Sequence, residues 1–286
     1  MSISLEKAFN EILSDKFNKV NIAVFTFITA VLGSVQLIFQ QQLQNRSNAP
    51  EYFQAVLICL IASLCGAVIS AGYGALAANR GASGSSDVFP PVSELGSIIQ
   101  TGIKSFLGCL ILAVMIVVPF FIVIAFSAGF FTALSGASRV LGVILLFCLA
   151  SAGFIVWLFF CLIKFFIPLY LMFADTLNFS AFFAFNKIKD FLDARKGFYF
   201  KYIINAVFIP ICFAIAFSIV MFIISIFFAA AAGPDALKAG APAAAIMQFI
   251  VYLLSVIFQV FISLLIISLN AQFISIGRVN QTAEEN

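Results

Sequence analysis

The chain has 286 residues, of which 63% are hydrophobic and 9% charged, and it contains 37 Phe and no His. Soluble globular chains are about half apolar and about a quarter charged, so this composition predicts an integral membrane protein that crosses the bilayer several times. The net charge of +3 is too small to indicate nucleic-acid binding, and the absence of His excludes an imidazole base and the usual His-containing zinc and haem sites.

The first predicted element, within residues 1–19, is an amphipathic cytoplasmic helix. It begins at Ser4, because Ser is a favoured N-cap residue. Leu5 and Leu13 fall on its apolar face, and Glu11 falls on the polar face. Such a helix lies in the headgroup plane of a membrane, with its apolar face in the lipid.

Six apolar runs are long enough to cross a bilayer, which takes roughly 20 residues. They form three hairpins at about residues 20–77, 103–163 and 199–277, in a membrane domain of residues 20–278 that precedes a polar tail of residues 279–286. No small-residue cleavage site follows the first run, so we interpret it as a retained span and not as a signal peptide. The six runs are Val20–Gln40, Phe53–Ala77, Ile103–Phe131, Leu141–Ile163, Tyr199–Ala231 and Ala243–Gly277.

A segment with amphipathic spacing precedes each hairpin. The three segments begin at Ser4, Ser93 and Ser180, at nearly equal intervals, and Ser is able to cap a helix at each position. The predicted fold class is therefore all-α, with six transmembrane helices as three hairpins, each preceded by an amphipathic interfacial helix. Because every repeat crosses the membrane twice, the three repeats share one orientation.

Basic residues divide unequally between the two sides of this topology. Twelve Lys and Arg lie on the side of both termini, and three, Arg46, Arg139 and Lys238, lie on the other side. Basic residues are retained on the cytoplasmic side of a membrane. This asymmetry predicts cytoplasmic termini and a multi-pass protein of the cytoplasmic (inner) membrane.

Lys164 ends the fourth predicted span, where its long side chain carries the ammonium group to the lipid headgroups. Asp175 lies three helical turns further on, which corresponds to about 16 Å of helical rise. Pro168 lies between the two residues and argues against a continuous helix. We therefore expect Lys164 to act as a membrane anchor without an ion pair to Asp175, and Asp175 to begin the following turn.

Gln259 is the most central polar side chain of the sixth predicted span, and Asn205 lies near the start of the fifth. Amides inside a membrane most often form hydrogen bonds between helices, each contributing on the order of 1 kcal/mol. Polar residues inside the membrane are also the default candidates for functional sites. Both interpretations, helix packing and a transport site, stay open for these two residues.

Pro119 and Pro210 fall at comparable depths in the first helices of the second and third hairpins. Interrupted helices at matching positions of a repeat are a pointer to a transporter binding site. Proline is also frequent in transmembrane helices whose neighbours satisfy the freed backbone groups. The two prolines are therefore consistent with a transporter and do not require one.

No arrangement of residues in the sequence indicates catalysis, since the predicted spans contain no paired carboxylates and the chain has no GxSxG, Walker or HExxH motif. We expect no enzyme activity, no cofactor and no metal site. The favoured function is a scaffold for a protein partner, or an organiser of membrane lipid, through the cytoplasmic interfacial helices; a second copy of the chain is another possible partner. The alternative is a transporter or transporter subunit for small or amphiphilic molecules. The intramembrane polar and helix-break positions proposed for either role are Gln259, Asn205, Lys164, Asp175, Pro119, Pro168 and Pro210.

Two stretches of sequence resemble a known family. The first, SAGYGALAANRGASGSSDVFPPVSELGSIIQ, contains a span that ends with Gly-Tyr, then a short basic turn and Phe-Pro-Pro before an amphipathic segment. Together with the downstream stretch FFIPLYLMFADTLNFSAFFAF, it is similar to the prokaryotic membrane proteins of domain-of-unknown-function family 4013, over about residues 20–278. The resemblance implies a bacterial or archaeal six-helix membrane protein, and it brings no known activity and no catalytic residues.

Overall fold

The computed structural model describes residues 3–14, 26, 50–85, 87–132, 137–195, 197–232 and 242–284. These residues form helices and turns, with no strand among them, so the all-α fold class is confirmed for the described part of the chain. Apart from Thr26, the predicted first span Val20–Gln40 lies outside the described residues. The α-helices are α1 (Leu5–Leu13), α3 (Pro50–Ala82), α4 (Leu95–Thr132), α5 (Ala137–Cys161), α6 (Ile167–Thr176), α7 (Ile188–Asp193), α8 (Phe198–Ile203), α9 (Ile209–Ala232) and α10 (Pro242–Glu284).

Five helical stretches among the described residues are long and apolar enough to cross a membrane. They overlap the second to sixth spans predicted from the sequence. These helices support the prediction of a multi-pass helical membrane protein. The stretches are Leu60–Ala82, Val92–Ile122, Cys148–Thr176, Phe198–Ile224 and Ile250–Asn280.

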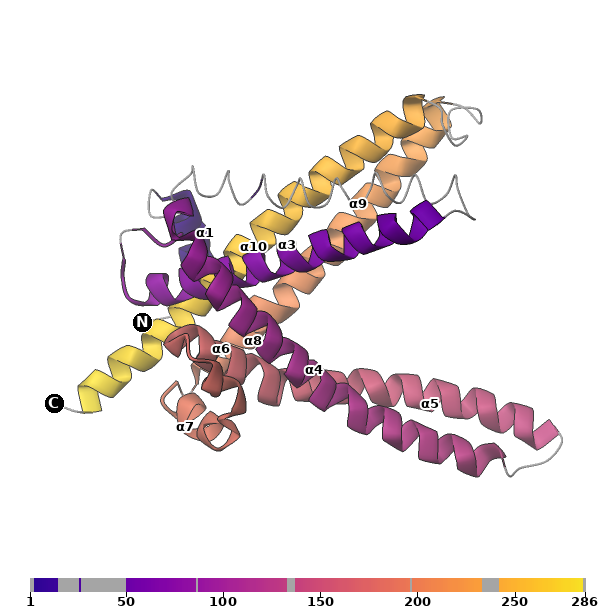
Figure 1. The fold of residues 1–286 in the computed structure, drawn as a ribbon, viewed down its shortest axis with the longest axis horizontal. Coiled ribbons are helices and arrows are strands. Elements are labelled where there is room, and N and C mark those ends of the chain that lie inside the picture. Colours follow the sequence, from indigo (N-terminus) through magenta and orange to yellow (C-terminus); the bar gives the residue numbers. More distant parts are fainter. Residues whose placement is uncertain are drawn as a thin grey trace.

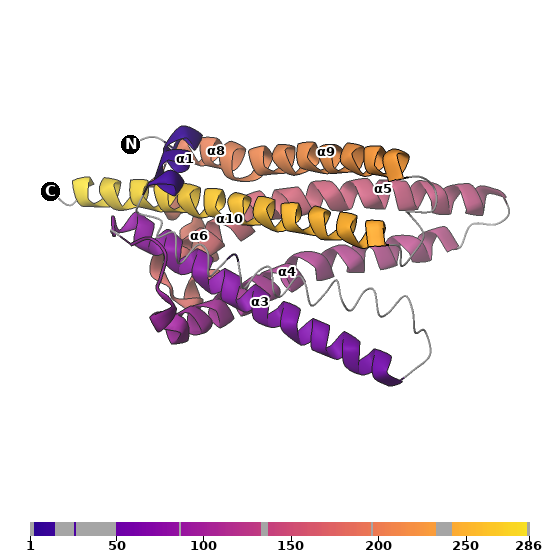
Figure 2. The ribbon, with the colours of Figure 1, turned by 90° about the horizontal axis from the view of Figure 1, so that it is seen from above.

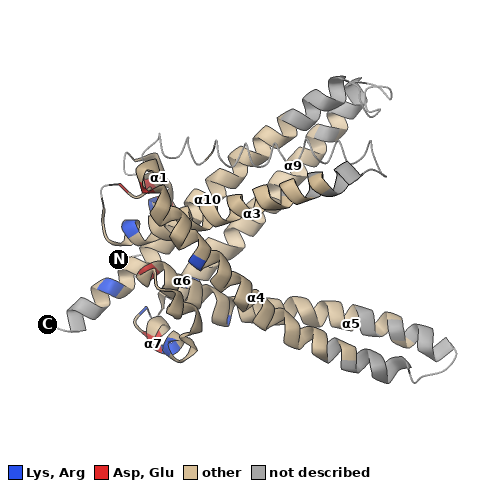
Figure 3. Cartoon of the chain, viewed as in Figure 1, with Lys and Arg blue, Asp and Glu red and all other residues tan. Residues whose placement is uncertain are grey.

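The long helices leave a common end of the molecule in two directions (Figure 1). Helices α4 and α5 run together in one direction, while α3, α9 and α10 run in the other. Seen from above, α3 crosses α4 (Figure 2). Helices α1, α6 and α7 gather at the common end, which we call the cap. The charged residues of the described part of the chain also concentrate toward this end (Figure 3).

Burial changes along the long helices, and α10 shows the change most clearly. Near its beginning Leu253 and Ile257 are exposed, although both are apolar, while Leu265 and Phe273 further along are fully buried. The buried residues pack with α1, α6 and α8 in one core at the cap. Exposed apolar residues are expected where a helix faces lipid, so the distal parts of these helices have the kind of surface that suits a membrane-spanning segment.

Helices α3 and α4 cross at a point where two glycines bring their backbones together. A Cβ atom added to Gly72 would lie 2.0 Å from the carbonyl oxygen of Ile98, and one added to Gly102 would lie 2.0 Å from that of Val68. Small residues at such crossings allow membrane helices to approach closely. No larger side chain fits at either position without moving one helix.

Of the three predicted N-caps, Ser4 is confirmed, because its Oγ accepts a hydrogen bond of 3.4 Å from the backbone N–H of Lys7. The predictions for Ser93 and Ser180 are wrong. Ser93 lies in a short 3₁₀ turn (Val92–Glu94) whose N-cap, Pro91, makes no side-chain bond, and α4 then continues unbroken into the predicted third span. The second interfacial segment is therefore not a separate helix.

The third interfacial segment is broken into two 3₁₀ turns, Phe179–Phe183 and Phe185–Lys187, followed by α7. Its first turn is capped by Asn178, whose side chain accepts from the backbone N–H of Ser180. Phe182, in the first of these turns, is fully buried against Gly108 of α4, where a Cβ atom would lie 2.2 Å from its ring.

Helix α1 packs against α10, and Leu5, Phe9 and Ile12 of its predicted apolar face pack against the core that the two helices share. Ala8 is fully buried and Leu13 is 77% exposed, and Glu11, predicted on the polar face, points to α10 and bonds with Ser268. Ala8 lies in the same core as Leu265 and Phe273 of α10, while Leu13 lies on the surface. Glu11, which the sequence placed on the polar face, therefore meets α10, and the exposed Leu13 agrees with the predicted contact of the apolar face with lipid.

Two five-residue π-helical segments end at the Phe of a Phe-Ile-Pro sequence, so that a proline follows each segment by two residues. Leu162–Phe166 precedes Pro168, and Ile204–Phe208 precedes Pro210. In both, the last N–H in π register bonds to the carbonyl five residues earlier, and the proline that follows has no N–H to continue the series. The expectation that Pro168 ends the helix is wrong, because the helical backbone continues through α6 to Thr176.

At the first π segment, the backbone carbonyl that the proline cannot bond to accepts a hydrogen bond from a side chain. In π register Pro168 would have bonded to the carbonyl of Ile163, and the hydroxyl of Tyr199 donates a hydrogen bond to that oxygen instead. Tyr199 belongs to α8, so this bond also joins two spans. Pro119 differs, because it lies inside α4 without such a segment. The structurally matching prolines are therefore Pro168 and Pro210, where the sequence predicted Pro119 and Pro210.

Candidate functional site

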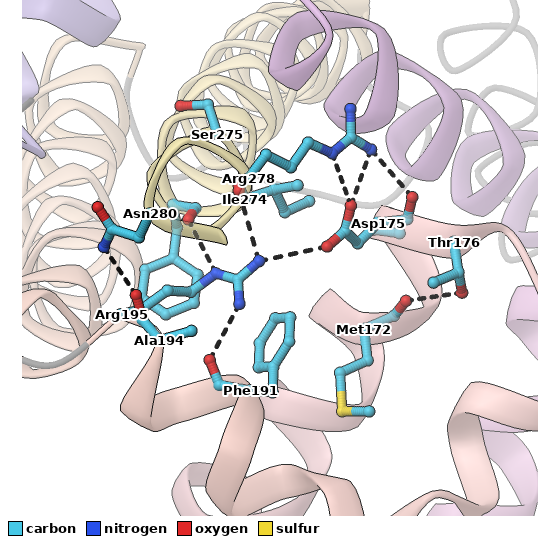
Figure 4. A network of polar contacts seen from close by, with 12 residues as sticks. Met172, Asp175, Thr176, Phe191, Ala194, Arg195, Ile274, Ser275, Arg278 and Asn280 are labelled. Carbon is cyan, nitrogen blue, oxygen red and sulfur yellow. Dashed lines mark hydrogen bonds and ion pairs between the residues drawn. The ribbon is translucent and has the colours of Figure 1, made fainter. Parts of the chain in front are cut away.

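Asp175 is the centre of a polar cluster in the cap, together with Arg195 and Arg278 (Figure 4). It lies in the last turn of α6, and its carboxylate receives one hydrogen bond from each arginine: 3.2 Å from Arg195 to Oδ2, and 2.8 Å from Nε of Arg278 to Oδ1. The three residues come from α6, the turn after α7, and α10. The Asp175 cluster therefore holds together three segments that are distant in the sequence.

Arg195 is the most deeply buried charged residue of the described chain, with 1% of its surface exposed. Its guanidinium donates to the backbone carbonyls of Phe191 (2.9 Å), Phe273 (3.2 Å) and Ile274 (3.4 Å) as well as to Asp175. It also lies 3.8 Å from the centre of the Phe191 ring, a cation–π arrangement. A buried charge is stable only when it is paired and hydrogen-bonded, and Arg195 meets both conditions.

Burial lowers the pKa of Arg195 to about 10, although the nearby Asp175 carboxylate acts in the opposite direction. Loss of water is thus the larger influence on this group, and the positive charge of Arg278 adds to it. Arg195 still carries its charge at neutral pH. The ion pair with Asp175 is therefore present under ordinary conditions.

Arg278 and Asn79 extend the cluster to α3. Arg278 also donates to Ser83 Oγ (2.7 Å) and to the backbone carbonyl of Asp175 (3.0 Å). Asn79 Nδ2 donates to the carbonyls of Ala174 (2.9 Å) and Asp175 (2.6 Å), which satisfies acceptors at the end of α6. Three helices, α3, α6 and α10, are thereby fixed relative to one another at the cap.

Gly277 gives the Arg195 side chain room to pass over α10. A Cβ atom at this position would lie 2.0 Å from the central carbon of the guanidinium. The pairing of Arg195 with Asp175 thus depends on glycine at position 277.

A second polar contact fixes α1 to α10. Glu11 Oε2 accepts hydrogen bonds from Ser268 Oγ (2.5 Å) and from Gln272 Nε2 (3.4 Å). Gln272 Oε1 in turn accepts from the backbone N–H of Ser4 (3.2 Å), just before α1. Ser268 and Gln272 are buried, so they depend on Glu11 and Ser4 for hydrogen bonds.

We predict that Glu11→Ala releases α1 from α10. Hydrogen bonds to a charged group contribute about 1.5–3 kcal/mol, so exchange of the backbone amides of α1 with deuterium should accelerate by about tenfold or more. Hydrogen exchange of residues 5–13 measures this change. Glu6→Ala is the matched control, because Glu6 is exposed on the same helix; equal exchange in the two variants would contradict the prediction.

A pocket of about 310 Å³ lies between α3, α6 and α10. Gln259, Ser263 and Asn270 line it from one face of α10, because their spacing of four and seven residues returns to the same side of a helix. Ser70 and Gly74 line it from α3, and Tyr170 lines it from α6. We call it the Gln259 pocket. Its polar lining is uncharged, and the remaining lining residues are Val260, Ile266 and Ile267.

Two hydrogen bonds define what the lining of the Gln259 pocket offers to a ligand. Tyr202 donates to Asn270 Oδ1 (2.6 Å), so the amide nitrogen is the donor that Asn270 brings. Ser263 Oγ donates to the backbone carbonyl of Gln259 (2.8 Å), so its oxygen is available as an acceptor. The pocket between α3, α6 and α10 therefore offers at least one donor and one acceptor beside the apolar side chains of Val260, Ile266 and Ile267.

The structure separates the residues that the sequence placed together as candidates. Gln259 lines the pocket. Asp175 does not line it and instead pairs with arginine in the Asp175 cluster of the cap. Lys164 is exposed at the π segment, and Pro119 is exposed in α4. Asn205 is buried within the second π segment, Pro168 and Pro210 are buried just after the two π segments, and none of the three lines the pocket.

Several residues of both sites were missed by sequence reasoning. Arg195 and Arg278 entered only as charges that set the topology, and a single sequence carries no signal that Arg195 is buried. Ser263 and Asn270 could have been found, because they share a helix face with Gln259 in a predominantly apolar run. The contact between Arg195 and the Phe191 ring could also have been expected, because residues one helical turn apart have side chains that meet.

These features define the class of the molecule: an all-helical, multi-pass membrane protein with a charged cap and a polar pocket beside it. Residues 55–223, more than half of the chain, match the family described as "Protein of unknown function (DUF4013)", and the chain belongs to that family. The resemblance predicted from the sequence is thereby confirmed. Comparison with curated proteins and with solved structures gives no match.

Proposed function

We propose that this protein binds a membrane amphiphile, with the polar head in the Gln259 pocket and the hydrocarbon chain along α3 and α10. The observation that carries the proposal is the pocket itself, which sets uncharged polar groups among apolar helices. Ligand pockets are mostly apolar with a few convergent polar groups that orient the ligand. This function falls in the class of transporters or transporter subunits for amphiphilic molecules, and it requires no covalent chemistry.

The length of α10 supports a position of the pocket near the lipid headgroups. About 20 helical residues cross the hydrocarbon core of a bilayer, so a crossing that starts at Pro242 ends near Ser263. From Leu264 onward most residues of α10 are buried in the cap. The Gln259 pocket would then lie where hydrocarbon gives way to headgroups, on the side of the cap.

The surroundings of the pocket support access from the lipid. Gln259 is exposed, and its neighbour Ile257 is 54% exposed. On α3, Ile61 and Leu64, which precede Ser70, are exposed as well. An amphiphile in the bilayer can therefore place its head in the pocket while its chain stays against apolar side chains.

We propose further that the cap, and both termini with it, face the cytoplasm. This orientation is supported by the excess of Lys and Arg predicted for that side. The bound amphiphile would then come from the cytoplasmic leaflet.

A scaffolding role through interfacial helices receives less support from the packing. It needs free apolar faces on α1 and α7, but Ala8 and Ile188 are buried, and Phe9 and Phe191 pack against the core of the cap. We therefore place ligand binding before scaffolding. An exposed residue such as Leu13 still offers α1 a contact with lipid.

Gly74→Leu is expected to block the pocket. A Cβ atom at Gly74 would have only the Tyr170 hydroxyl within 4 Å, at 3.7 Å, so the variant should fold while its longer side chain fills the space. The full-length protein is reconstituted in phosphatidylcholine vesicles that contain traces of lipids with a photoreactive acyl chain and neutral, anionic or cationic heads. Labelling of α3 and α10 near the pocket, measured by mass spectrometry, should fall about tenfold, equivalent to about 1.4 kcal/mol of binding free energy.

The matched control is Gly153→Leu in α5, where nothing lies within 4 Å of an added Cβ atom. It makes the same change at an exposed position of another span and should leave labelling unchanged. If none of the three lipids labels the pocket, or if Gly74→Leu and Gly153→Leu behave alike, the proposed function is wrong.

A further inference from the structure

We infer that the Gln259 pocket selects an uncharged lipid whose head carries free hydroxyl groups, such as a diacylglycerol or a monohexosyl diacylglycerol. The inference rests on the proposed function and names the ligand class of that same pocket. Its basis is the chemistry of the five polar lining residues, none of which carries a charge at neutral pH: Ser70, Tyr170, Gln259, Ser263 and Asn270.

A charged head would lack a counter-charge in the pocket. The nearest arginine along α10 is Arg278, which lies about 12 Å of helical rise beyond Asn270. The guanidinium of Arg278 is engaged by Asp175 and Ser83, and that of Arg195 is engaged by Asp175 and three backbone carbonyls. Because an unpaired charge is costly to remove from water, a phosphate or an ammonium group is disfavoured here.

The hydrogen-bond pattern distinguishes a hydroxyl from the ester, ether and ionised phosphate groups of a glycerolipid. The side-chain oxygen of Asn270 already accepts a hydrogen bond from Tyr202, so its amide nitrogen is the group that can donate to a ligand. The hydroxyl of Ser263 already donates to the Gln259 carbonyl, so its oxygen is the group that can accept from a ligand. A ligand that meets both must accept from Asn270 and donate to Ser263. Hydroxyl groups do both, whereas esters, ethers and ionised phosphates only accept.

The size of the pocket limits how much of the lipid enters it. A volume of about 310 Å³ is at the lower end of the range for small-molecule sites. It accommodates a compact head and leaves the acyl chains outside, against the exposed side chains of α3 and α10. A glycerolipid with a small hydroxylated head fits both requirements.

The test compares heads of different charge on one photoreactive acyl chain. The full-length protein in phosphatidylcholine vesicles receives photoreactive diacylglycerol, phosphatidylglycerol or a cationic trimethylammonium lipid at equal mole fraction. We expect diacylglycerol to label the pocket about tenfold more than either charged lipid, as one lost or unsatisfied hydrogen bond predicts. Gln259→Lys should lower labelling by diacylglycerol and raise labelling by phosphatidylglycerol, because it supplies a positive charge.

Gln54→Lys makes the same substitution at an exposed position of α3 away from the pocket and should leave the preference unchanged. Stronger labelling of the wild-type pocket by phosphatidylglycerol or by the cationic lipid overturns the inference and leaves the proposed function standing. Failure of every lipid to label the pocket overturns both. A preference that Gln259→Lys and Gln54→Lys shift equally also overturns the inference, since it would arise from the surface charge of the protein.

Discussion

Asp175→Ala should destabilise the protein by about 3–5 kcal/mol, the usual effect of removing one partner from a buried ion pair. The substitution leaves the Arg195 guanidinium in the cap without a carboxylate, and only 1% of this arginine is exposed to water. Arg278, whose side chain is 32% exposed, can turn toward solvent, but Arg195 cannot. Unfolding of the purified protein in mixed detergent micelles measures the change.

Two variants show whether the charge or the shape of Asp175 matters. Asp175→Asn retains an acceptor for Arg195 and should be less harmful than Asp175→Ala, while Asp193→Ala removes an exposed carboxylate nearby and should have little effect. Combining Asp175→Ala with Arg195→Met removes both charges and should recover part of the lost stability. An Asp175→Ala protein as stable as the wild type would show that the Asp175 cluster does not hold the cap together.

Gly102→Ala is expected to separate α3 from α4 at their crossing. The added methyl group would lie 2.0 Å from the backbone oxygen of Val68, and a backbone atom cannot move away by changing a rotamer. We expect a loss of about 3 kcal/mol, the upper part of the range for an overpacked contact. Thermal unfolding of the wild type and the variant, in the same detergent, measures this difference.

The control for Gly102→Ala is a variant whose stability is expected to stay equal or rise. Gly153→Ala makes the same change in α5 with nothing within 4 Å of the new atom, and alanine favours a helix over glycine by up to about 1 kcal/mol. Stability should therefore stay equal or rise. Equal losses for the two variants would mean that the loss comes from the helix backbone and not from the crossing.

The elements that depend on local sequence are the ones that could be predicted. Runs of about 20 apolar residues are enough to locate the five spans, and a serine before an isolated amphipathic segment located the start of α1 at Ser4. The same residue type at Ser93 and Ser180 gave wrong predictions. Each lies beside a neighbouring structure, α4 or the buried Phe182, whose packing outweighs the preference of one capping residue.

The candidate site could be predicted only in part, because contacts between distant helices determine it. Gln259 was recognised as a polar residue in an apolar span, which is a local observation. The burial of Arg195 depends on Gly277, which lies more than eighty residues further along the chain. The contact of Glu11 with α10 depends on the hydrogen-bond partners that Ser268 and Gln272 offer to it.

The π-helical segment Leu162–Phe166 has a consequence for the direction in which α6 presents its side chains. A π turn takes one more residue than an α turn, and one residue corresponds to about 100° of rotation around a helix axis. Tyr170 and Asp175 both follow this segment. With a plain α-helix, both side chains would point about a quarter turn away, Tyr170 from the pocket and Asp175 from its arginines. One additional residue in the π turn thus determines the direction in which α6 presents Tyr170 to the ligand pocket and Asp175 to the arginines of the cap.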